Sequence, residues 1–185
     1  MSQLLDVNNS LLLLVDIQTR LLSVMPEEAA ENMTELSTRL TSAANLLDVP
    51  VFLTEQYPKG LGSTIDSINA ELNHSTQRFE KTAFSCCAAE GFMEALEKSG
   101  RKQIIIAGQE AHVCILQSAL ELMQQGYQVH VLEDVTCSRK AENKFYALQR
   151  MQQAGSTISN FESVLFEWLK DAQHPNFSDI SQLLR

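Results

Sequence analysis

Asp16 stands where an apolar run of the sequence ends, directly after the five apolar residues at positions 11–15. In such a place the loss of hydration favours the neutral carboxyl group unless a cation lies nearby. A carboxylate held there can accept a proton from a neighbouring group. It can also cap the turn that follows, as a strand-end aspartate commonly does. Both interpretations of Asp16 stay open at this point.

Cys114 is the second residue that could do chemistry, because it falls in the first turn of the helix expected after Gly108. The positive end of the helix dipole and the unpaired backbone N–H groups there favour the thiolate, which is the reactive form of cysteine. A cysteine between Val113 and Ile115 can equally be inert packing, since a buried free cysteine behaves as a small hydrophobe. Both interpretations of Cys114 stay open as well.

Lys81 is the third candidate, because it is an ammonium group in the mostly apolar stretch at residues 79–84. A lysine on the surface explains the same pattern. In an open parallel sheet, ligands bind beyond the carboxyl ends of the strands, where the strand order reverses. This rule selects the end of the strand before Asp16 and the turn that carries Cys114.

Short apolar runs alternate with longer amphipathic stretches, which is typical of strand–helix repeats in a mostly parallel sheet covered on both faces. We predict strands at residues 10–16, 49–54, 103–108, 127–133 and 156–159. We predict helices at residues 31–47, 89–98, 112–125, 141–154, 161–169 and 177–184, with Asn160 capping the fifth. Residues 55–81 have weak periodicity and several Pro and Gly breaks, which predict a long loop. The sum is a three-layer α/β/α, Rossmann-like domain.

The composition fits one soluble globular domain over residues 1–185, since 44% of the residues are hydrophobic and 20% are charged. The formal net charge of −9 argues against a surface that neutralises phosphate or anionic lipid, so we expect no nucleic-acid partner. The sequence does not open with a basic segment followed by an apolar one, and no apolar run approaches the roughly 20 residues of a membrane helix. We therefore expect a cytoplasmic protein that does not contact a membrane.

The four cysteines predict free thiols, because the chain is large enough to fold without disulfides. No CxxC motif and no Cys/His zinc spacing occurs, so we predict neither a metal nor another cofactor. The adjacent Cys86 and Cys87 are expected to pack, since neighbouring cysteines rarely bridge without strain. Cys137 is expected in a polar turn that caps the next helix.

Three motifs of the chain resemble the cysteine hydrolases of the isochorismatase-like superfamily. They are Leu-Leu-Val-Asp-Ile-Gln at residues 13–18, Phe-Glu-Lys-Thr-Ala-Phe-Ser at 79–85 and Gly-Gln-Glu-Ala-His-Val-Cys-Ile-Leu-Gln-Ser-Ala at 108–119. The order of the three candidates, Asp then Lys then Cys, is that of the family. Within the superfamily, residues 54–58 and the His-Pro pair at 174–175 look most like the isochorismatase domain-containing proteins.

The resemblance implies a role for each candidate: Cys114 attacks a carbonyl group, Asp16 takes the thiol proton, and Lys81 holds charge beside both. It also implies a cis peptide bond between Gln109 and Glu110. The backbone N–H groups of Glu110 and Cys114 would then form an oxyanion hole for the tetrahedral intermediate.

Two departures from relatives in the superfamily narrow the expected chemistry. Nicotinamidases carry an Asp-x-His metal-binding element after the second strand, whereas residues 54–58 read Thr-Glu-Gln-Tyr-Pro and contain no His, which disfavours a metal site. Isochorismatases cleave a vinyl ether without a nucleophilic cysteine, so the presence of Cys114 points toward acyl chemistry.

Four further residues are candidates for lining the substrate pocket: Gln18, Gln56, Tyr57 and His112. His112 can instead cap its helix, and it does not face Cys114, because helical residues two positions apart point in different directions. We predict a hydrolase of a small amide or related acyl compound, acting through a thioester at Cys114 and forming a homo-oligomer. The alternatives are ether or ester cleavage of the isochorismatase type and a non-catalytic, oligomeric small-molecule-binding protein.

Overall fold

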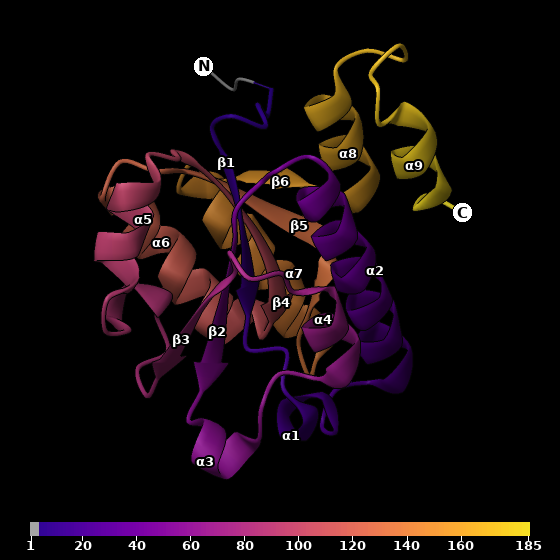
Figure 1. Cartoon of the computed structure of the whole chain (residues 1–185). Coiled ribbons are helices and arrows are strands. Elements are labelled where there is room, and N and C mark those ends of the chain that lie inside the picture. Colours follow the sequence, from indigo (N-terminus) through magenta and orange to yellow (C-terminus); the bar gives the residue numbers. More distant parts are fainter. Residues whose placement is uncertain (1–3) are drawn as a thin grey trace.

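The computed structural model describes residues 4–185 and contains a sheet of six parallel strands in the order β3-β2-β1-β4-β5-β6 (Figure 1). The strands are β1 (Ser10–Val15), β2 (Val51–Gln56), β3 (Gln77–Lys81), β4 (Gln103–Gln109), β5 (Gln128–Cys137) and β6 (Thr157–Ser159). The direction of chain progress across the sheet reverses between β1 and β4. The predicted α/β class with a Rossmann-like parallel sheet is confirmed.

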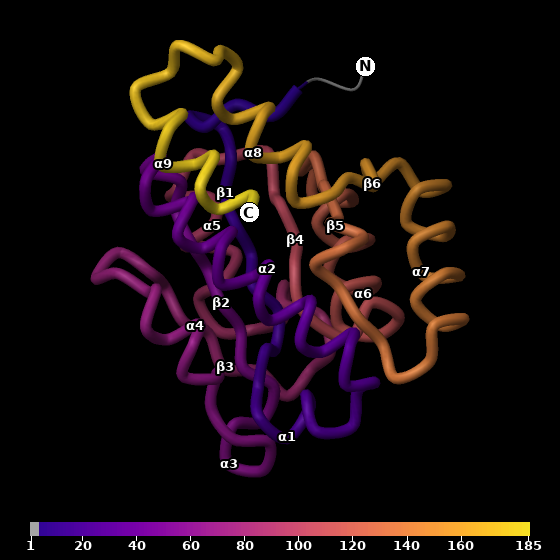
Figure 2. The backbone as a smooth tube through the Cα atoms, turned by 90° about the vertical axis from the view of Figure 1, so that its right-hand side faces the viewer, coloured from indigo at the N-terminus to yellow at the C-terminus, as the bar shows by residue number. Residues whose placement is uncertain are grey.

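Helices cover both faces of the sheet, as the predicted three layers require. One layer, which faces the viewer in Figure 2, contains α2 (Glu27–Leu46), α4 (Asp66–Glu71), α8 (Phe161–Leu169) and α9 (Phe177–Gln182). The other layer contains α5 (Phe92–Ser99), α6 (Leu116–Gln124) and α7 (Ala141–Gln153). The short helices α1 (Thr19–Leu22) and α3 (Pro58–Leu61) lie at the bottom of Figure 1, where β1 and β2 end. Within residues 4–185, every helix is too short or too polar to cross a membrane.

Alternate residues of β1 pack into opposite layers, because successive side chains of a strand point to opposite faces of the sheet. Leu12 and Leu14 join the core under α2 and α8, whereas Leu13 and Val15 join the core under α5 and α6. All six residues of β1 are buried. The continuous apolar run in the sequence therefore reflects a central strand covered on both sides.

The stretch 55–81 is not the long loop that the sequence predicts. It contains α3, α4 and the edge strand β3, which pairs with β2. Within β3 only Phe79 and Lys81 are buried, and their neighbours are exposed. The strand therefore alternates in burial at its end and lacks the apolar run that marks the central strands. Lys81 is the last residue of this strand, which was not predicted from the sequence.

Several other boundaries differ from the prediction by a few residues, and three of the differences are relevant to the site or the core. Helix α2 begins at Glu27, and the helix predicted from residue 112 starts as a π-helical turn, Ala111–Ile115, before continuing as α6. Strand β5 extends to Cys137, so this cysteine is buried in the sheet and not in a polar turn. The predicted cap of α8 is confirmed, because the Asn160 side chain accepts a hydrogen bond from the backbone N–H of Ser163 at 2.8 Å.

Gly108 allows β4 to approach β1 closely at the point where the strand order reverses. It pairs with Val15 and has a φ of +116°. A Cβ atom at this position would lie 2.2 Å from the backbone oxygen of Val15. Glycine is therefore needed here both for its conformation and for the absence of a side chain.

We expect Gly108→Ala to lower the free energy of unfolding by about 3 kcal/mol or more, because overpacking against backbone adds to left-handed strain. The matched control is Gly126→Ala, whose φ is +83° but whose Cβ would meet no atom within 4 Å. The control should lose only the strain, about 1–2 kcal/mol. Urea unfolding measures both, and equal losses would contradict the close approach.

Candidate active site

Folding brings Asp16, Lys81 and Cys114 together at the carboxyl ends of three strands. Asp16 follows β1, Lys81 is the last residue of β3, and Cys114 lies in the π-helical turn after β4. This end of the sheet is at the bottom of Figure 1, near α1 and α3. It is also the place where the strand order reverses, which is where ligands bind in open parallel sheets.

Asp16 and Lys81 form a buried ion pair. The ammonium Nζ donates a hydrogen bond to Asp16 Oδ2 at 2.7 Å, and both side chains are fully shielded from solvent. Thr54 Oγ1 donates to the other carboxylate oxygen, Oδ1, at 2.7 Å. Burial disfavours the charged amine, but the Asp16 carboxylate and the neighbouring Cys86 and Cys114 sulfurs together outweigh it and raise the pKa of Lys81. Lys81 is therefore an ammonium at neutral pH.

The alternation of β2 and β3 explains why these groups meet. Phe52 and Phe79 pack in the core under α5, with their ring centroids 5.3 Å apart. Thr54 lies two residues beyond Phe52, and Lys81 two beyond Phe79, so each lies on the same face as its aromatic neighbour. An apolar residue deep in the core is thus followed, two positions later, by a polar residue at the crevice.

Gln56 lies on the same face of β2 and pairs in register with Lys81. Its side-chain oxygen accepts a hydrogen bond from Lys81 Nζ at 2.6 Å, and its side-chain nitrogen donates to the carbonyl of Thr82 at 2.7 Å. Both ends of this amide are thus engaged by the protein. The expectation that Gln56 lines the substrate pocket does not fit this arrangement.

The side chain of Gln18 is fully buried and hydrogen-bonded within the protein, so its predicted role at the pocket stays a prediction. Its oxygen accepts from the backbone N–H of Gln56 at 2.7 Å, and its nitrogen donates to the carbonyls of Gln56 at 3.0 Å and of Gly62. Gln18 therefore braces the end of β2 and the loop after it. The sequence alone does not distinguish a bracing amide from one that faces a ligand.

Cys114 is buried, with 6% of its surface exposed. Ser118 Oγ donates to its backbone carbonyl at 2.7 Å, which fixes the turn that carries the thiol. Burial and the Asp16 carboxylate raise the pKa of Cys114, whereas the Lys81 ammonium opposes that shift. At neutral pH the raised pKa makes Cys114 a neutral thiol beside a carboxylate, although its position at a helix start by itself favours the thiolate.

Gln109 connects the turn that carries Cys114 to the end of β1. The peptide bond between Gln109 and Glu110 is cis. The Gln109 side-chain nitrogen donates to the backbone carbonyl of Asp16 at 2.9 Å, and its oxygen accepts a weak bond from the Cys137 thiol at 3.6 Å. The buried amide of Gln109 therefore contacts both the residue after β1 and the last residue of β5.

Glu110 and His112 connect the turn that carries Cys114 to the segment between β5 and α7 by hydrogen bonds. The Glu110 carboxylate accepts hydrogen bonds from the backbone N–H of Arg139 at 2.9 Å and from its Nε at 3.1 Å. The His112 ring contacts Ser138 Oγ through Nδ1 at 3.0 Å and the Asn143 amide through Nε2 at 3.3 Å. Both ring nitrogens thus face the protein, which does not fit the expectation that His112 lines the pocket.

Cys86 is a neighbour of the site for which the sequence gives no signal. It is fully buried, and its sulfur lies 3.7 Å from Thr54 Oγ1. Its backbone N–H donates to Ser118 Oγ at 2.8 Å. Burial raises the pKa of Cys86 to about 12. It is therefore a neutral packing residue behind the three candidate catalytic groups.

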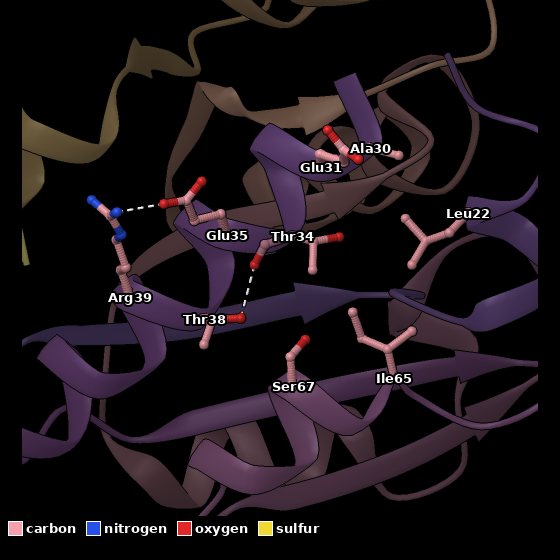
Figure 3. Close-up of a pocket in the computed structure, with 9 residues that line it drawn as sticks. All are labelled: Leu22, Ala30, Glu31, Thr34, Glu35, Thr38, Arg39, Ile65 and Ser67. Carbon is pink, nitrogen blue, oxygen red and sulfur yellow. Dashed lines mark hydrogen bonds and ion pairs between the residues drawn. The ribbon is translucent and has the colours of Figure 1, made fainter. Parts of the chain in front are cut away.

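A cavity of about 380 Å³ opens beside Lys81, and this volume suits a small ligand. Its lining comes from the connection after β2 and from the end of β3 and the residues beyond it, namely Tyr57, Pro58, Lys59, Glu80, Lys81, Thr82, Ala83 and Ala88. Tyr57, which is 54% exposed, stays a predicted pocket residue. Of the three candidate catalytic residues, only Lys81 lines this cavity, and none of them lines the larger groove in Figure 3, which lies between α1, α2 and α4.

The side chain of Glu55 is used for structure. Its Oε1 accepts hydrogen bonds from the backbone N–H and the hydroxyl of Thr64, both at 2.7 Å, and it forms an ion pair with Arg78.

Over residues 4–185, no three His, Cys, Asp or Glu side chains are grouped as a metal site requires.

Comparison with known proteins gives a consistent match over most of the chain. The family model of the isochorismatase domain matches residues 10–163. Isochorismatase family protein 1A of Dictyostelium discoideum is 38% identical over 183 residues, which cover 97% of this chain and 87% of that protein.

Two solved structures share the fold at higher coverage than the family model. The structure described as MAR1 ribonuclease from Caenorhabditis elegans has 33% identity and a TM-score of 0.91, covering 97% of this chain and 91% of that one. The YcaC gene product of Escherichia coli, described as an octameric hydrolase of unknown specificity, has 26% identity and a TM-score of 0.91, covering 97% and 88%.

We expect Lys81→Met to lower the free energy of unfolding by about 3–5 kcal/mol, because it leaves the buried Asp16 charge without its partner. The matched control is Lys170→Met, which removes an ion pair with Asp6 whose side chains are 52% and 43% exposed. That loss should be at most about 1 kcal/mol. Denaturant unfolding near neutral pH compares the two, and similar losses would mean that the Asp16–Lys81 pair is solvated in solution.

Proposed function

The chain belongs to the isochorismatase family of hydrolases, and we propose that it is a cysteine-dependent hydrolase of a small amide or related acyl compound. The single observation that carries the proposal is the buried Asp16–Lys81 pair next to the Cys114 thiol. In this proposal Cys114 is the nucleophile, Asp16 transfers protons, and Lys81 holds the carboxylate in place and supplies positive charge.

The charge count of the site supports proton transfer from Cys114 to Asp16. A neutral thiol, a carboxylate and an ammonium carry no net charge together. Loss of the thiol proton to solvent would leave one net negative charge in a buried site, whereas transfer to Asp16 keeps the sum unchanged. Burial and Asp16 both raise the pKa of Cys114, so a free thiolate is disfavoured. Asp16 therefore takes the proton as the sulfur attacks.

The proposed reaction has two halves. The Cys114 sulfur attacks the carbonyl carbon while its proton moves to Asp16, and the backbone N–H groups of Glu110 and Cys114 hydrogen-bond the resulting oxyanion. The intermediate collapses to a thioester as Asp16 returns its proton to the leaving amine. Water then attacks the thioester carbon while Asp16 takes one of its protons. The bond between carbon and sulfur breaks, Asp16 returns the proton to the Cys114 sulfur, and the acid leaves.

The relatives support a further proposal about assembly. One solved neighbour is described as an octamer, and this chain exposes Phe145 and Tyr146 side by side on α7, at 55% and 67%. We propose that the chain forms a homo-oligomer. All four cysteines are free, which fits the reducing environment of the cytoplasm as the proposed location.

We expect Cys114→Ala to reduce hydrolysis at least about a thousandfold, because the covalent route is removed. The assay is a panel of carboxamides, esters, isochorismate and RNA, with release of ammonia, acid or cleaved product as the readout. Cys87→Ala, a free thiol outside the site, is the matched control and should retain activity.

Each outcome of the panel points to a different function. Amide turnover that survives in Cys114→Ala would contradict the thioester, and turnover of isochorismate alone would favour ether cleavage. RNA cleavage would favour the activity of the nematode neighbour, although the net charge of −9 opposes RNA binding. No turnover of any compound would favour a binding protein.

We expect Asp16→Asn to shift the alkylation of Cys114 to lower pH and to slow hydrolysis. The carboxylate raises the pKa of Cys114, so an uncharged residue of the same shape leaves a thiol that ionises more easily beside Lys81. Hydrolysis should fall about a hundredfold or more, because no group remains to move the proton. Iodoacetamide rates measured between pH 6 and 10 test the first half, and an unmoved or higher pH curve would contradict the contact between Asp16 and Cys114.

A further inference from the structure

We propose that Gln56 is a positioning residue, which holds the Lys81 ammonium in a single orientation between Asp16 and the side of the site that faces Cys114. The inference rests on the proposed function, since Cys114 is taken as the reacting group. Its basis is the pair of hydrogen bonds at the two ends of the Gln56 amide.

The orientation of the Gln56 amide is fixed by its partners. Lys81 Nζ can only donate and the Thr82 carbonyl can only accept, so the side-chain oxygen must face the lysine and the nitrogen must face the carbonyl. The backbone of Gln56 is clamped on both sides by Gln18, which accepts from its N–H and donates to its carbonyl. Gln56 therefore presents its oxygen from a rigid base.

The ammonium of Lys81 has three N–H groups, and the structure uses two of them. One is bonded to Asp16 Oδ2 at 2.7 Å and the second to Gln56 Oε1 at 2.6 Å. With two of its bonds fixed in direction, the third N–H of a tetrahedral ammonium has only one direction left. The two hydrogen bonds thus fix the place of the positive charge that lowers the pKa of the neighbouring Cys114.

Burial makes the second hydrogen bond important. The Lys81 side chain has no exposed surface, so its charge is stabilised by its protein partners and not by bulk water. An unpaired N–H of a buried ammonium favours release of its proton or movement of the side chain. Gln56 thus acts through Lys81 and does not itself need to contact substrate.

Two substitutions at residue 56 should change the titration of Lys81 in opposite directions. Gln56→Met keeps the length of the side chain but removes the oxygen, and should lower the titration midpoint by about one pH unit, the tenfold change expected for one hydrogen bond to a charged group. Gln56→Glu keeps an oxygen and adds a negative charge, so the midpoint should rise by at least about half a unit. A residue that only filled space would not produce opposite shifts.

The measurement is the pH dependence of the Lys81 side-chain signal in NMR spectra of protein with 13C-labelled lysine, assigned by its loss in Lys81→Arg. The matched controls are Gln77→Met and Gln77→Glu, the same changes at an exposed position at the start of β3, which should leave the midpoint unmoved. If Gln56→Met does not fold, Gln56→Glu decides alone: an upward shift supports the inference, and an unmoved midpoint overturns it. Equal midpoints in all variants also overturn it.

The readout needs no substrate, so the two proposals fail separately. A wild-type protein that hydrolyses nothing, with the opposite shifts at residue 56, would overturn the hydrolase proposal while Gln56 still positions Lys81. Hydrolysis that depends on Cys114, with unmoved titration in the Gln56 variants, would overturn only the role of Gln56.

Discussion

The attraction between Asp16 and Lys81 is the interaction on which the site depends. Neither charge is exposed, so each is tolerable inside the protein only because the other is present. The pair also joins β1 to β3, which are not neighbours, because β2 lies between them. Thr54 and Gln56, at the end of β2, bridge that gap by hydrogen-bonding the carboxylate and the ammonium respectively. The polar contacts at the carboxyl ends of β3, β2 and β1 therefore follow the order of these strands in the sheet.

The same pair determines the state of the nucleophile. A helix start favours a thiolate, yet Cys114 is shielded from water and lies beside a carboxylate, and these effects prevail over the helix. The thiol is consequently stored in its unreactive form, which suits a nucleophile whose activation is coupled to substrate binding. Cys86, whose sulfur lies 3.7 Å from Thr54 Oγ1, is neutral for the same two reasons, burial and the Asp16 carboxylate.

The central part of this fold is readable from sequence because burial on both faces leaves a continuous apolar run, as in β1 and β4. The edge strand β3 is not readable in this way, since only Phe79 and Lys81 are buried and their neighbours are polar. The three candidate catalytic residues could be named from motifs, but their supporting contacts could not. Gln18, Gln56 and His112 look like ligand-facing side chains until their hydrogen-bond partners, which are distant in sequence, are known.

The site divides into an interior and a border that belong to different parts of the chain. The groups that carry charge or protons are fixed at strand ends, where the close pairing of Gly108 with Val15 leaves little freedom. The cavity beside Lys81 is bordered mainly by connecting segments, including Tyr57, Pro58 and Ala83. Such segments accept changes of length and residue without displacing the sheet. Proteins with this architecture can therefore change their substrate through the connecting segments while keeping the groups at the strand ends. Relatives with the same interior need not share a substrate.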